Sequence, residues 1–196
     1  MADLIAAGGS FDEPSHVYRD PSGAVLDSVT TIIAPLTDYG SVPAAILEFA
    51  RERGGHVHRA CELHDSDDLV MDTLDIRLLP YVQAWQQFRK DYPCTWEHVE
   101  RPEWSPILRY AGTPDRRGVF LRERKRLVLE IKATAVTMPS VAVQLSGYDL
   151  TEEPRADELW VVRLRKDGRY RRAVMPAVHG TFLSCLNIFN WKRKNK

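Results

Sequence analysis

The stretch LVLEIKAT, residues 127–134, is an apolar run interrupted by two opposite charges. Val128 and Ile131 belong to a pattern that predicts a buried strand. Glu130 and Lys132 are two residues apart, so on a strand they project from the same face. Charges inside a sheet core cost free energy unless each is paired with an opposite charge or binds an ion. We therefore expect this strand to lie in the core of a sheet and its two charges to serve a functional site.

The elements predicted around this strand indicate a mixed α/β domain. Beyond residue 93 the pattern predicts three consecutive antiparallel strands, a helix, a hairpin and a closing helix. Their ranges are 95–104, 108–120 and 126–134 for the strands, 138–151 for the helix, 158–176 for the hairpin and 179–193 for the closing helix. We expect one central mixed β-sheet flanked by helices, with residues 1–196 forming a single domain.

The N-terminal half predicts a hairpin followed by helices. Residues 1–15 are expected to be loosely ordered, and residues 190–196 to form a frayed basic tail. Residues 16–33 predict a short strand, an Asp-Pro-Ser-Gly turn and a β-branched second strand. Residues 66–75 look like the polar start of a helix, and residues 76–92 are strongly amphipathic with helical spacing.

A helix is also predicted for residues 42–64, with Ile46, Phe49 and Val57 facing the core. Two glycines, at 54–55, interrupt it, and each costs a helix roughly 1 kcal/mol relative to alanine. Either two helices meet at this pair, or another group approaches the backbone closely there.

Composition excludes several classes of protein. Hydrophobic residues make up 44% of the chain and charged residues 28%, as in ordinary soluble domains. No apolar run is long enough to span a bilayer, and the N-terminus lacks the basic and apolar segments of a signal peptide. Cys61, Cys94 and Cys185 are widely spaced, which favours a reducing, cytoplasmic compartment. Their spacing argues against a disulfide framework, a structural zinc site and an iron–sulfur cluster.

A net charge of zero hides an asymmetry along the chain. Ten of the 27 basic residues lie from residue 161 onward, where Asp167 is the one acidic residue. The remainder holds 17 basic and 26 acidic residues. An acidic body with a basic C-terminal segment suits a protein that binds cations at one place and a polyanion at another. The alternative is a solvated basic face.

The strand before LVLEIKAT carries Asp115, and a turn around residues 120–126 would bring it beside Glu130. Two adjacent carboxylates repel, and each raises the pKa of the other. A divalent cation relieves this repulsion, and hard oxygen ligands suit Mg²⁺ or Mn²⁺. Lys132 would then be able to orient an attacking water. The pattern favours phosphodiester hydrolysis; the alternative is a surface aspartate and a Glu–Lys pair on an exposed edge strand.

The predicted helices carry further polar side chains. His58 and Glu62 share a helix face, and the neutral imidazole of His58 can ligate a metal. A zinc site from His58, Cys61 and His64 is an alternative, although it lacks a fourth ligand.

Gln144 and Tyr148 also share one helix face, where an amide and a phenol can position a water, a catalytic side chain or a phosphate. The alternative for this pair is ordinary helix surface and core.

Together these residues resemble the PD-(D/E)XK nuclease superfamily, in its RecB-like, phage-type exonuclease branch. The stretch DSVTTII, residues 27–33, is also similar to a segment of the mitochondrial genome maintenance exonuclease group. The resemblance runs from Val17 to Leu150 and implies a restriction-endonuclease-like core. The matching motifs, in the order of the family, are Gly54-x-x-x-His58, Gly112-Thr113-Pro114-Asp115, Glu130-Ile131-Lys132 and Gln144-x-x-x-Tyr148.

The resemblance implies a metal-dependent DNA exonuclease that hydrolyses phosphodiester bonds at DNA ends in recombination, repair or phage DNA processing. Asp115 and Glu130 would bind Mg²⁺ or Mn²⁺ together with the Ile131 carbonyl, and His58 would complete the metal shell. Lys132 would orient or help to deprotonate the water. The residues expected to support the site or contact DNA are Gln144, Tyr148, Thr30, Thr31 and Glu100.

The chain departs from the commonest family pattern in having Glu-x-Lys in place of Asp-x-Lys. It lacks the cysteine cluster of the iron–sulfur members, so no such cluster is expected. The expected partners are DNA and a single-strand annealing or recombination protein, in the cytoplasm of a bacterial or phage-infected cell, with no membrane. The rival functions are an endonuclease of the same fold, a non-catalytic DNA-binding module and a metal hydrolase that acts on other substrates.

Overall fold

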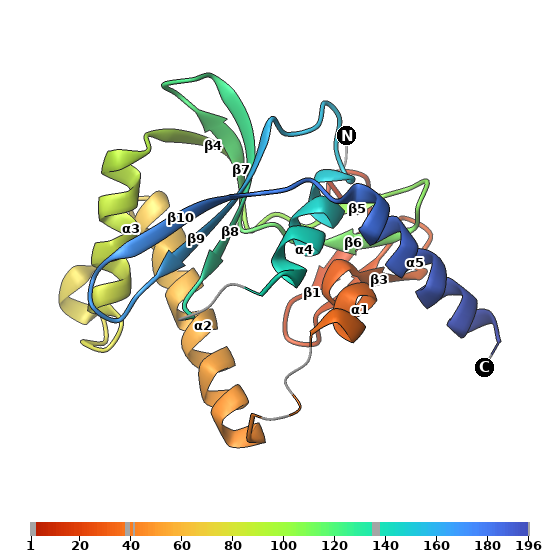
Figure 1. Ribbon diagram of the computed structural model, residues 1–196, viewed down its shortest axis with the longest axis horizontal. Helices are drawn as coiled ribbons and strands as arrows, with labels where there is room; N and C mark the ends of the chain where they lie inside the picture. The colour runs from red at the N-terminus through yellow and green to blue at the C-terminus, as the bar shows by residue number, and fades with distance from the viewer. Residues whose placement is uncertain (1–2, 38–39, 41, 135–137, 196) are drawn as a thin grey trace.

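Strand β8, Lys125–Lys132, is the central strand of a five-stranded mixed sheet, as its apolar sequence predicts (Figure 1). The computed structural model describes residues 3–37, 40, 42–134 and 138–195. The strand order is β10-β9-β8-β7-β4, and neighbours run antiparallel except for the parallel pair β8 and β9. The other strands of this sheet are β4, Cys94–Val99; β7, Arg116–Phe120; β9, Glu158–Leu164; and β10, Tyr170–Met175.

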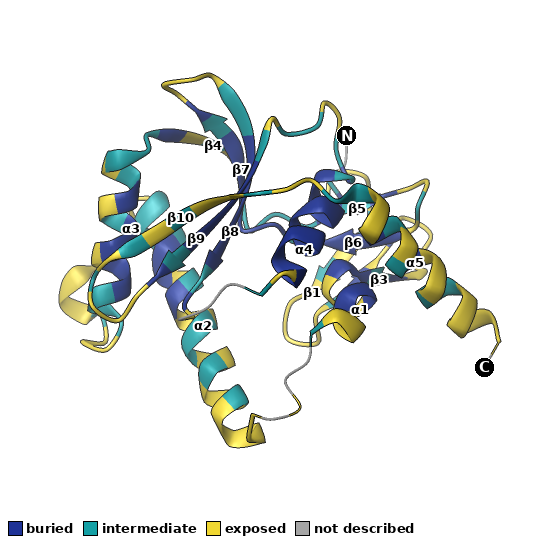
Figure 2. Ribbon diagram, in the orientation of Figure 1, coloured by how far each residue is buried: buried dark blue, intermediate teal, exposed yellow. Residues whose placement is uncertain are grey.

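Helices cover both faces of this sheet because the side chains of β8 alternate between two apolar clusters (Figure 2). Leu127, Leu129 and Ile131 pack in one cluster with residues of α2 and α3. Val128 packs in the other with residues of α1, α4 and α5. The helices are α1, Val29–Ile33; α2, Ala44–Asp65; α3, Leu79–Asp91; α4, Ser140–Asp149; and α5, His179–Lys194, with short 3-10 turns η1, Ala34–Leu36, and η2, Met71–Thr73.

The prediction of one central sheet is wrong, because the N-terminal strands build a second five-stranded mixed sheet. Residues 1–15 were expected to be loosely ordered, yet Leu4 is fully buried against Tyr18, Leu26 and Ala111. This small apolar cluster pins the segment to the sheet. The strands, in the order β1-β2-β3-β6-β5, are β1, Ser10–Asp12; β2, Val17–Arg19; β3, Val25–Ser28; β5, Glu103–Ser105; and β6, Tyr110–Gly112.

Two predicted long strands each divide between the two sheets. Residues 95–104 form β4 and β5, and the backbone turns between them at Glu100, whose φ is +46°. Residues 108–120 form β6 and β7, and the break falls at Pro114, which has no N–H for a ladder hydrogen bond. The antiparallel pairing of β7 with β8 and the β9–β10 hairpin are confirmed.

The predicted hairpin at 16–33 is confirmed for β2 and β3, but its β-branched end forms α1 instead of continuing as a strand. Ser28 caps this helix, because its hydroxyl oxygen accepts a hydrogen bond from the Thr31 N–H at 3.0 Å. Residues 66–75 contain only the turn η2 and no longer helix. The basic tail is not frayed through residue 194, where α5 ends.

Helix α2 runs without a break through the glycines at 54–55, where an added Cβ would meet nothing within 4 Å. Two helices therefore do not meet at this pair, and no described atom of the protein approaches it closely. The C-terminal half of α2 buries Val57 in the core. The N-terminal half extends away from the body (Figure 1), so Ile46 and Phe49 are 58% and 57% exposed instead of facing inward. None of the described helices is both long and apolar enough to cross a bilayer.

Candidate functional site

Asp115 lies near the C-terminal end of β8 because it directly precedes β7, which pairs with β8 in antiparallel register. Arg116 is the partner of Leu129 in that register. The Ile131 N–H donates to Asp115 Oδ2 at 2.5 Å, which fixes the carboxylate on the backbone between Glu130 and Lys132. The side-by-side placement that the sequence predicts for these strands is confirmed.

His58 brings α2 to the same point. Its Nδ1 lies 3.3 Å from Asp115 Oδ1 and 3.6 Å from Glu100 Oε1. Its Nε2 lies 3.0 Å from the Ile131 carbonyl oxygen, to which it donates when protonated. The imidazole therefore bridges two carboxylates and a main-chain carbonyl with both ring nitrogens.

Glu100 reaches the cluster through the irregular end of β4. The register of β4 against β7 shifts between Trp96 and His98, and Glu100 follows with a left-handed φ of +46°. The Glu100 N–H donates to the Asp115 carbonyl oxygen at 3.1 Å, which holds this strained residue in place.

Glu130 faces a second set of partners on the side of α4. Its Oε1 accepts from Lys132 Nζ at 2.5 Å and from Gln144 Nε2 at 2.9 Å. Gln144 Nε2 is also 3.0 Å from the hydroxyl oxygen of Tyr148. The other carboxylate oxygen, Oε2, is buried and has no hydrogen-bond partner in the described part of the chain. A buried acceptor without a donor is costly, and such atoms mark places where a ligand or ion can bind.

Tyr148 fits beside this cluster because Gly112 has no side chain. A Cβ on Gly112 would lie 2.6 Å from Tyr148 Cε1, closer than real contacts allow. Nearby, the Tyr18 hydroxyl lies 2.9 Å from Thr113 Oγ1. The Gly-Thr-Pro stretch that precedes Asp115 is thus tightly packed where the chain passes from one sheet to the other.

Burial and charge shift the proton affinities of the cluster in different directions. Burial lowers the pKa of His58, but the Asp115 carboxylate outweighs it, so the pKa lies well above the usual value of 6.5. Burial raises the pKa of Asp115, and the facing His58 charge then brings it below 3.8. Burial and the Asp115 charge raise the pKa of Glu100. Burial and Asp115 also raise that of Glu130 to about 7, although Lys132 opposes the shift.

Ligand-type atoms of His58, Glu100 and Asp115 all lie within 4.8 Å of one another, a separation from which they can hold one cation. Glu130, predicted as a ligand beside Asp115, is not in this group among the described residues and is paired with Lys132 instead. Glu100, predicted only as a supporting acid, is in it.

The alternative zinc site is not assembled. Cys61 is buried in the apolar cluster with Trp85, and burial raises the pKa of its thiol. His64 Nδ1 lies 3.7 Å from Asp65 Oδ1 and not beside His58 in the metal-capable group. A zinc site made of these three residues would need the Cys61 thiolate and both imidazoles to converge on one point.

Thr30 and Thr31 belong to the cap of α1. Their hydroxyls lie 2.9 Å and 2.8 Å from Ser28 Oγ. Both residues are exposed, and no hydrogen bond joins them to the carboxylate cluster within the described ranges. They are the part of the predicted site that the fold does not bring to Asp115.

Arg116 and Asp65 are the site residues that sequence reasoning missed. The Arg116 guanidinium donates to Asp65 Oδ2 at 2.8 Å, to the Asp115 carbonyl at 2.6 Å and to Glu100 Oε1 at 3.3 Å. It therefore ties the end of α2 to Asp115 and Glu100. The signal in the sequence was the Arg-Arg doublet directly after Asp115, because an arginine inside a strand needs buried acids.

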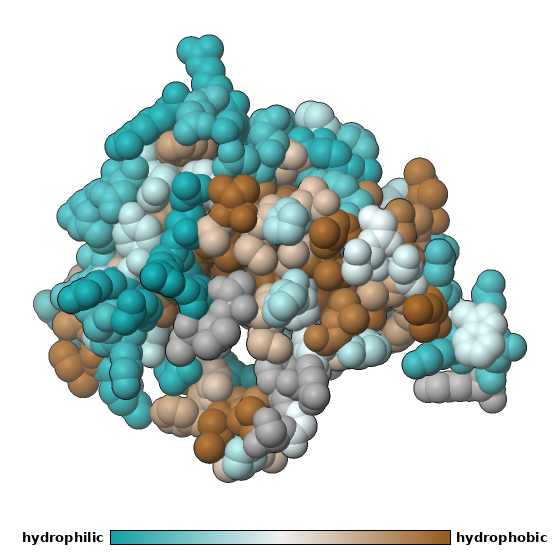
Figure 3. Space-filling view, viewed as in Figure 1, coloured by the Kyte–Doolittle hydropathy of each residue, from teal (hydrophilic) through white to brown (hydrophobic). Residues whose placement is uncertain are grey.

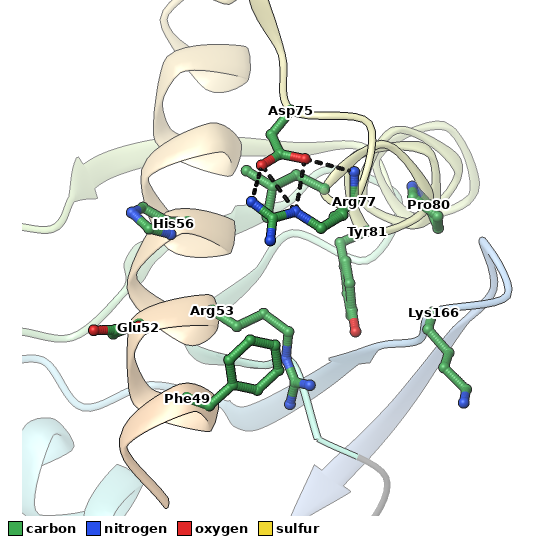
Figure 4. Close-up of a pocket in the computed structure, with 10 residues that line it drawn as sticks. Phe49, Glu52, Arg53, His56, Asp75, Arg77, Pro80, Tyr81 and Lys166 are labelled. Atoms are coloured by element: carbon green, nitrogen blue, oxygen red, sulfur yellow. Dashed lines mark hydrogen bonds and ion pairs between the residues drawn. The ribbon is translucent and has the colours of Figure 1, made fainter. Parts of the chain in front are cut away.

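A cavity of about 410 Å³ lies beside α2 (Figure 4). It opens between α2, the start of α3 and the β9–β10 turn, with Arg53 on one wall and Lys166 on another. Asp75 and Arg77 form an ion pair at its rim, 2.5 Å between Oδ2 and Nη2. Arg53 Nη2 also donates to the Ala133 carbonyl at 3.2 Å. The cavity adjoins the site through Arg53, but the carboxylate cluster is not part of its lining.

Comparison of the chain with protein-family models and with curated proteins finds no match in either case.

The raised pKa of Glu130 predicts an unusual pH dependence of stability without metal. The folded protein holds this proton up to about pH 7, whereas an unfolded glutamate releases it near pH 4.5. The free energy of unfolding that depends on Glu130 therefore falls as pH rises from 4.5 to 7 and stays low above that. Glu130→Gln removes this penalty, so in EDTA its stability relative to wild type should rise by about 2 to 3 kcal/mol between pH 5 and pH 8.

Urea unfolding at several pH values measures this difference. Exposed Glu48, whose ion pair with Arg51 spans 3.7 Å, provides the matched control Glu48→Gln, for which no pH-dependent gain in relative stability of this size is expected. Parallel pH curves for Glu130→Gln and wild type would contradict the prediction.

Proposed function

We propose that the chain is a Mg²⁺- or Mn²⁺-dependent deoxyribonuclease of the PD-(D/E)XK class. The observation that carries the proposal is the cluster of Asp115, His58 and Glu100, in which Asp115 and His58 contact the Ile131 N–H and carbonyl between Glu130 and Lys132. Four motifs far apart in the sequence therefore meet at one strand. The antiparallel β7–β8 pair, followed by α4 and the parallel strand β9, supports a restriction-endonuclease-like core.

The donor set fits a hard divalent cation. It consists of carboxylate oxygens and one imidazole, and Mg²⁺ and Mn²⁺ prefer sites that are rich in oxygen ligands. Buried Glu130 Oε2 lacks a hydrogen-bond partner in the described residues and can serve as a further ligand. Such an ion would supply a Lewis acid for phosphodiester hydrolysis. Asp115, Glu100 and His58 would hold it, with Glu130 and the Ile131 carbonyl close by.

The remaining residues position the reacting groups. Lys132 Nζ, restrained by Glu130, orients the attacking water and stabilises negative charge on the phosphate as the transition state forms. Gln144 and Tyr148 hold Glu130 in turn, since the Gln144 amide contacts both Glu130 Oε1 and the Tyr148 hydroxyl. The loss of either would misplace Lys132 indirectly.

We further propose that the enzyme is an exonuclease that acts at DNA ends in recombination, repair or phage DNA processing. This part rests on the resemblance of the four motifs to RecB-like and phage-type exonucleases. It includes a cytoplasmic location and a single-strand annealing or recombination protein as a partner. The basic residues from 161 onward support DNA as the polyanionic substrate.

Digestion of end-labelled linear DNA tests the proposal. Purified protein should degrade single- or double-stranded DNA labelled at the 5′ or 3′ end when Mg²⁺ or Mn²⁺ is present, and should not do so in EDTA. A covalently closed circle of the same sequence should remain intact, whereas an endonuclease would cut it. DNA binding without cleavage would indicate a binding module, and cleavage of small phosphodiesters alone would indicate another hydrolase.

A further inference from the structure

Three basic residues line up across the strands beside the candidate site. In the parallel pair β8 and β9, Lys132 is the partner of Arg163. In the antiparallel pair β9 and β10, Arg163 is the partner of Arg171. Neighbouring strands lie about 4.8 Å apart, so the row of Lys132, Arg163 and Arg171 extends about 10 Å from the site to the β10 edge.

This row lies on the face of the sheet that carries Glu130. Side chains alternate along a strand, so Glu130 and Lys132 share a face of β8 and Arg163 continues it on β9. The next residue of β10, Arg172, lies on the opposite face, where its guanidinium is 4.3 Å from the ring centroid of Trp160. Arg172 therefore packs on the face that α2 and α3 cover, while Arg171 lies on the other face and is exposed.

Like charges on directly opposite strand positions are destabilising, and this row places cations at two such pairs of positions, although Glu130 pairs with Lys132 at 2.5 Å. Arg171 is an exposed side chain with no hydrogen bond or ion pair to any described residue. Hydrophilic side chains gather over β9 and β10 in Figure 3, on the face turned to the viewer. Lys132 and Arg163 are half-buried and Arg171 is exposed, so the row runs from the site to the surface at the β10 edge, and a row of cations has the chemistry to bind successive phosphates.

We propose that Lys132, Arg163 and Arg171 bind the sugar–phosphate backbone of the DNA strand next to the scissile phosphate. The substrate strand then crosses β8, β9 and β10 in that order and leaves over the β10 edge of the sheet. This inference rests on the proposed nuclease function and adds to it the path of the strand. The contacts go to phosphates, so they bind any base sequence equally well.

The salt dependence of DNA binding tests the row without requiring cleavage. A fluorescent oligonucleotide is titrated in EDTA at several salt concentrations, with wild type, Arg171→Ala, Arg171→Lys and Arg122→Ala. Arg122 is an exposed arginine in the turn between β7 and β8, at the far end of the same sheet, and serves as the matched control.

Loss of one phosphate contact should weaken binding several-fold and lower the slope of log K against log salt by about 0.7 to 0.9. We expect this for Arg171→Ala, whereas Arg171→Lys and Arg122→Ala should keep the wild-type slope. In Mg²⁺, the ratio of DNA cleavage to hydrolysis of bis(p-nitrophenyl) phosphate should also fall for Arg171→Ala, because the small ester is too short to reach β10.

Equal slopes for Arg171→Ala and Arg122→Ala would overturn the proposed path while leaving nuclease activity of the wild type intact. A variant that self-associates but binds DNA with the wild-type slope would also overturn it and would assign Arg171 to protection of the exposed strand edge. If the slope falls for Arg171→Ala but wild-type protein cleaves no DNA in Mg²⁺ or Mn²⁺, the proposed phosphate contacts are supported and the proposed nuclease activity is refuted.

Discussion

Asp115→Asn and Lys132→Ala should each lower the turnover of linear DNA by about 10³-fold or more, equivalent to about 4 kcal/mol of transition-state stabilisation. Asp115 contacts both His58 and the Ile131 N–H, so its neutralisation removes the charge on which the cluster is centred. Lys132 is the cation that Glu130 directs toward the site. Timed digestion of end-labelled DNA in Mg²⁺ measures both effects.

Matched variants separate loss of chemistry from loss of structure. Lys125→Ala removes a lysine from the other end of β8, and Asp12→Asn neutralises an exposed acid in β1. Both should digest DNA at close to the wild-type rate. Thermal melting should show that Asp115→Asn and Lys132→Ala remain folded. Full Mg²⁺-dependent activity in either site variant would refute the assignment of these residues to the reaction.

The centre of the fold could be predicted from the sequence because local and long-range preferences agree there. The apolar run around Ile131 predicted a buried strand, and the short turn before Lys125 predicted that β7 and β8 pair; both are observed. A strand that is apolar on both faces needs helices on both sides, and α4 and α3 supply them. The predicted proximity of Asp115 to Glu130 followed from this register.

The second sheet could not be predicted, because its strands have only three or four residues each. Such short segments have little periodicity, and their pairing depends on distant contacts such as Leu4 with Ala111. Helix propensity alone also predicted an irregularity in α2 at the glycines at 54–55. Burial of Val57 and the contact of His58 with the carboxylate cluster outweigh the free-energy cost of these glycines, and the helix continues.

The position of Glu100 depends on backbone geometry that residue types do not encode. A register shift in β4 and a positive φ turn this side chain toward His58. The pairing of Glu130 with Lys132 also differs from the expectation that both charges would face a ligand separately. Without a cation, Lys132 Nζ lies 2.5 Å from Glu130 Oε1 on the same strand face, an arrangement that the sequence alone left open.

Replacement of Arg116 by methionine should destabilise the protein by about 3 to 5 kcal/mol, because it removes a buried cation that contacts two acids. Arg116 is fully buried, and its guanidinium lies 5.4 Å from the ring centroid of Trp85. Its acid partners are Asp65 and Glu100. Urea unfolding measures the loss, and Arg122→Met, at an exposed turn, should cost less than about 0.5 kcal/mol.

A double-mutant cycle shows whether this cost comes from the unpaired acid or from lost packing. Asp65 also accepts from Arg89 at 3.1 Å and from Trp85 Nε1 at 3.2 Å, so it is not left entirely unpartnered. If charge dominates, Arg116→Met combined with Asp65→Asn should be more stable than the sum of the two single losses, by about 1 to 3 kcal/mol. Strict additivity would mean that Arg116 stabilises the fold by packing on Trp85 and not by neutralising Asp65.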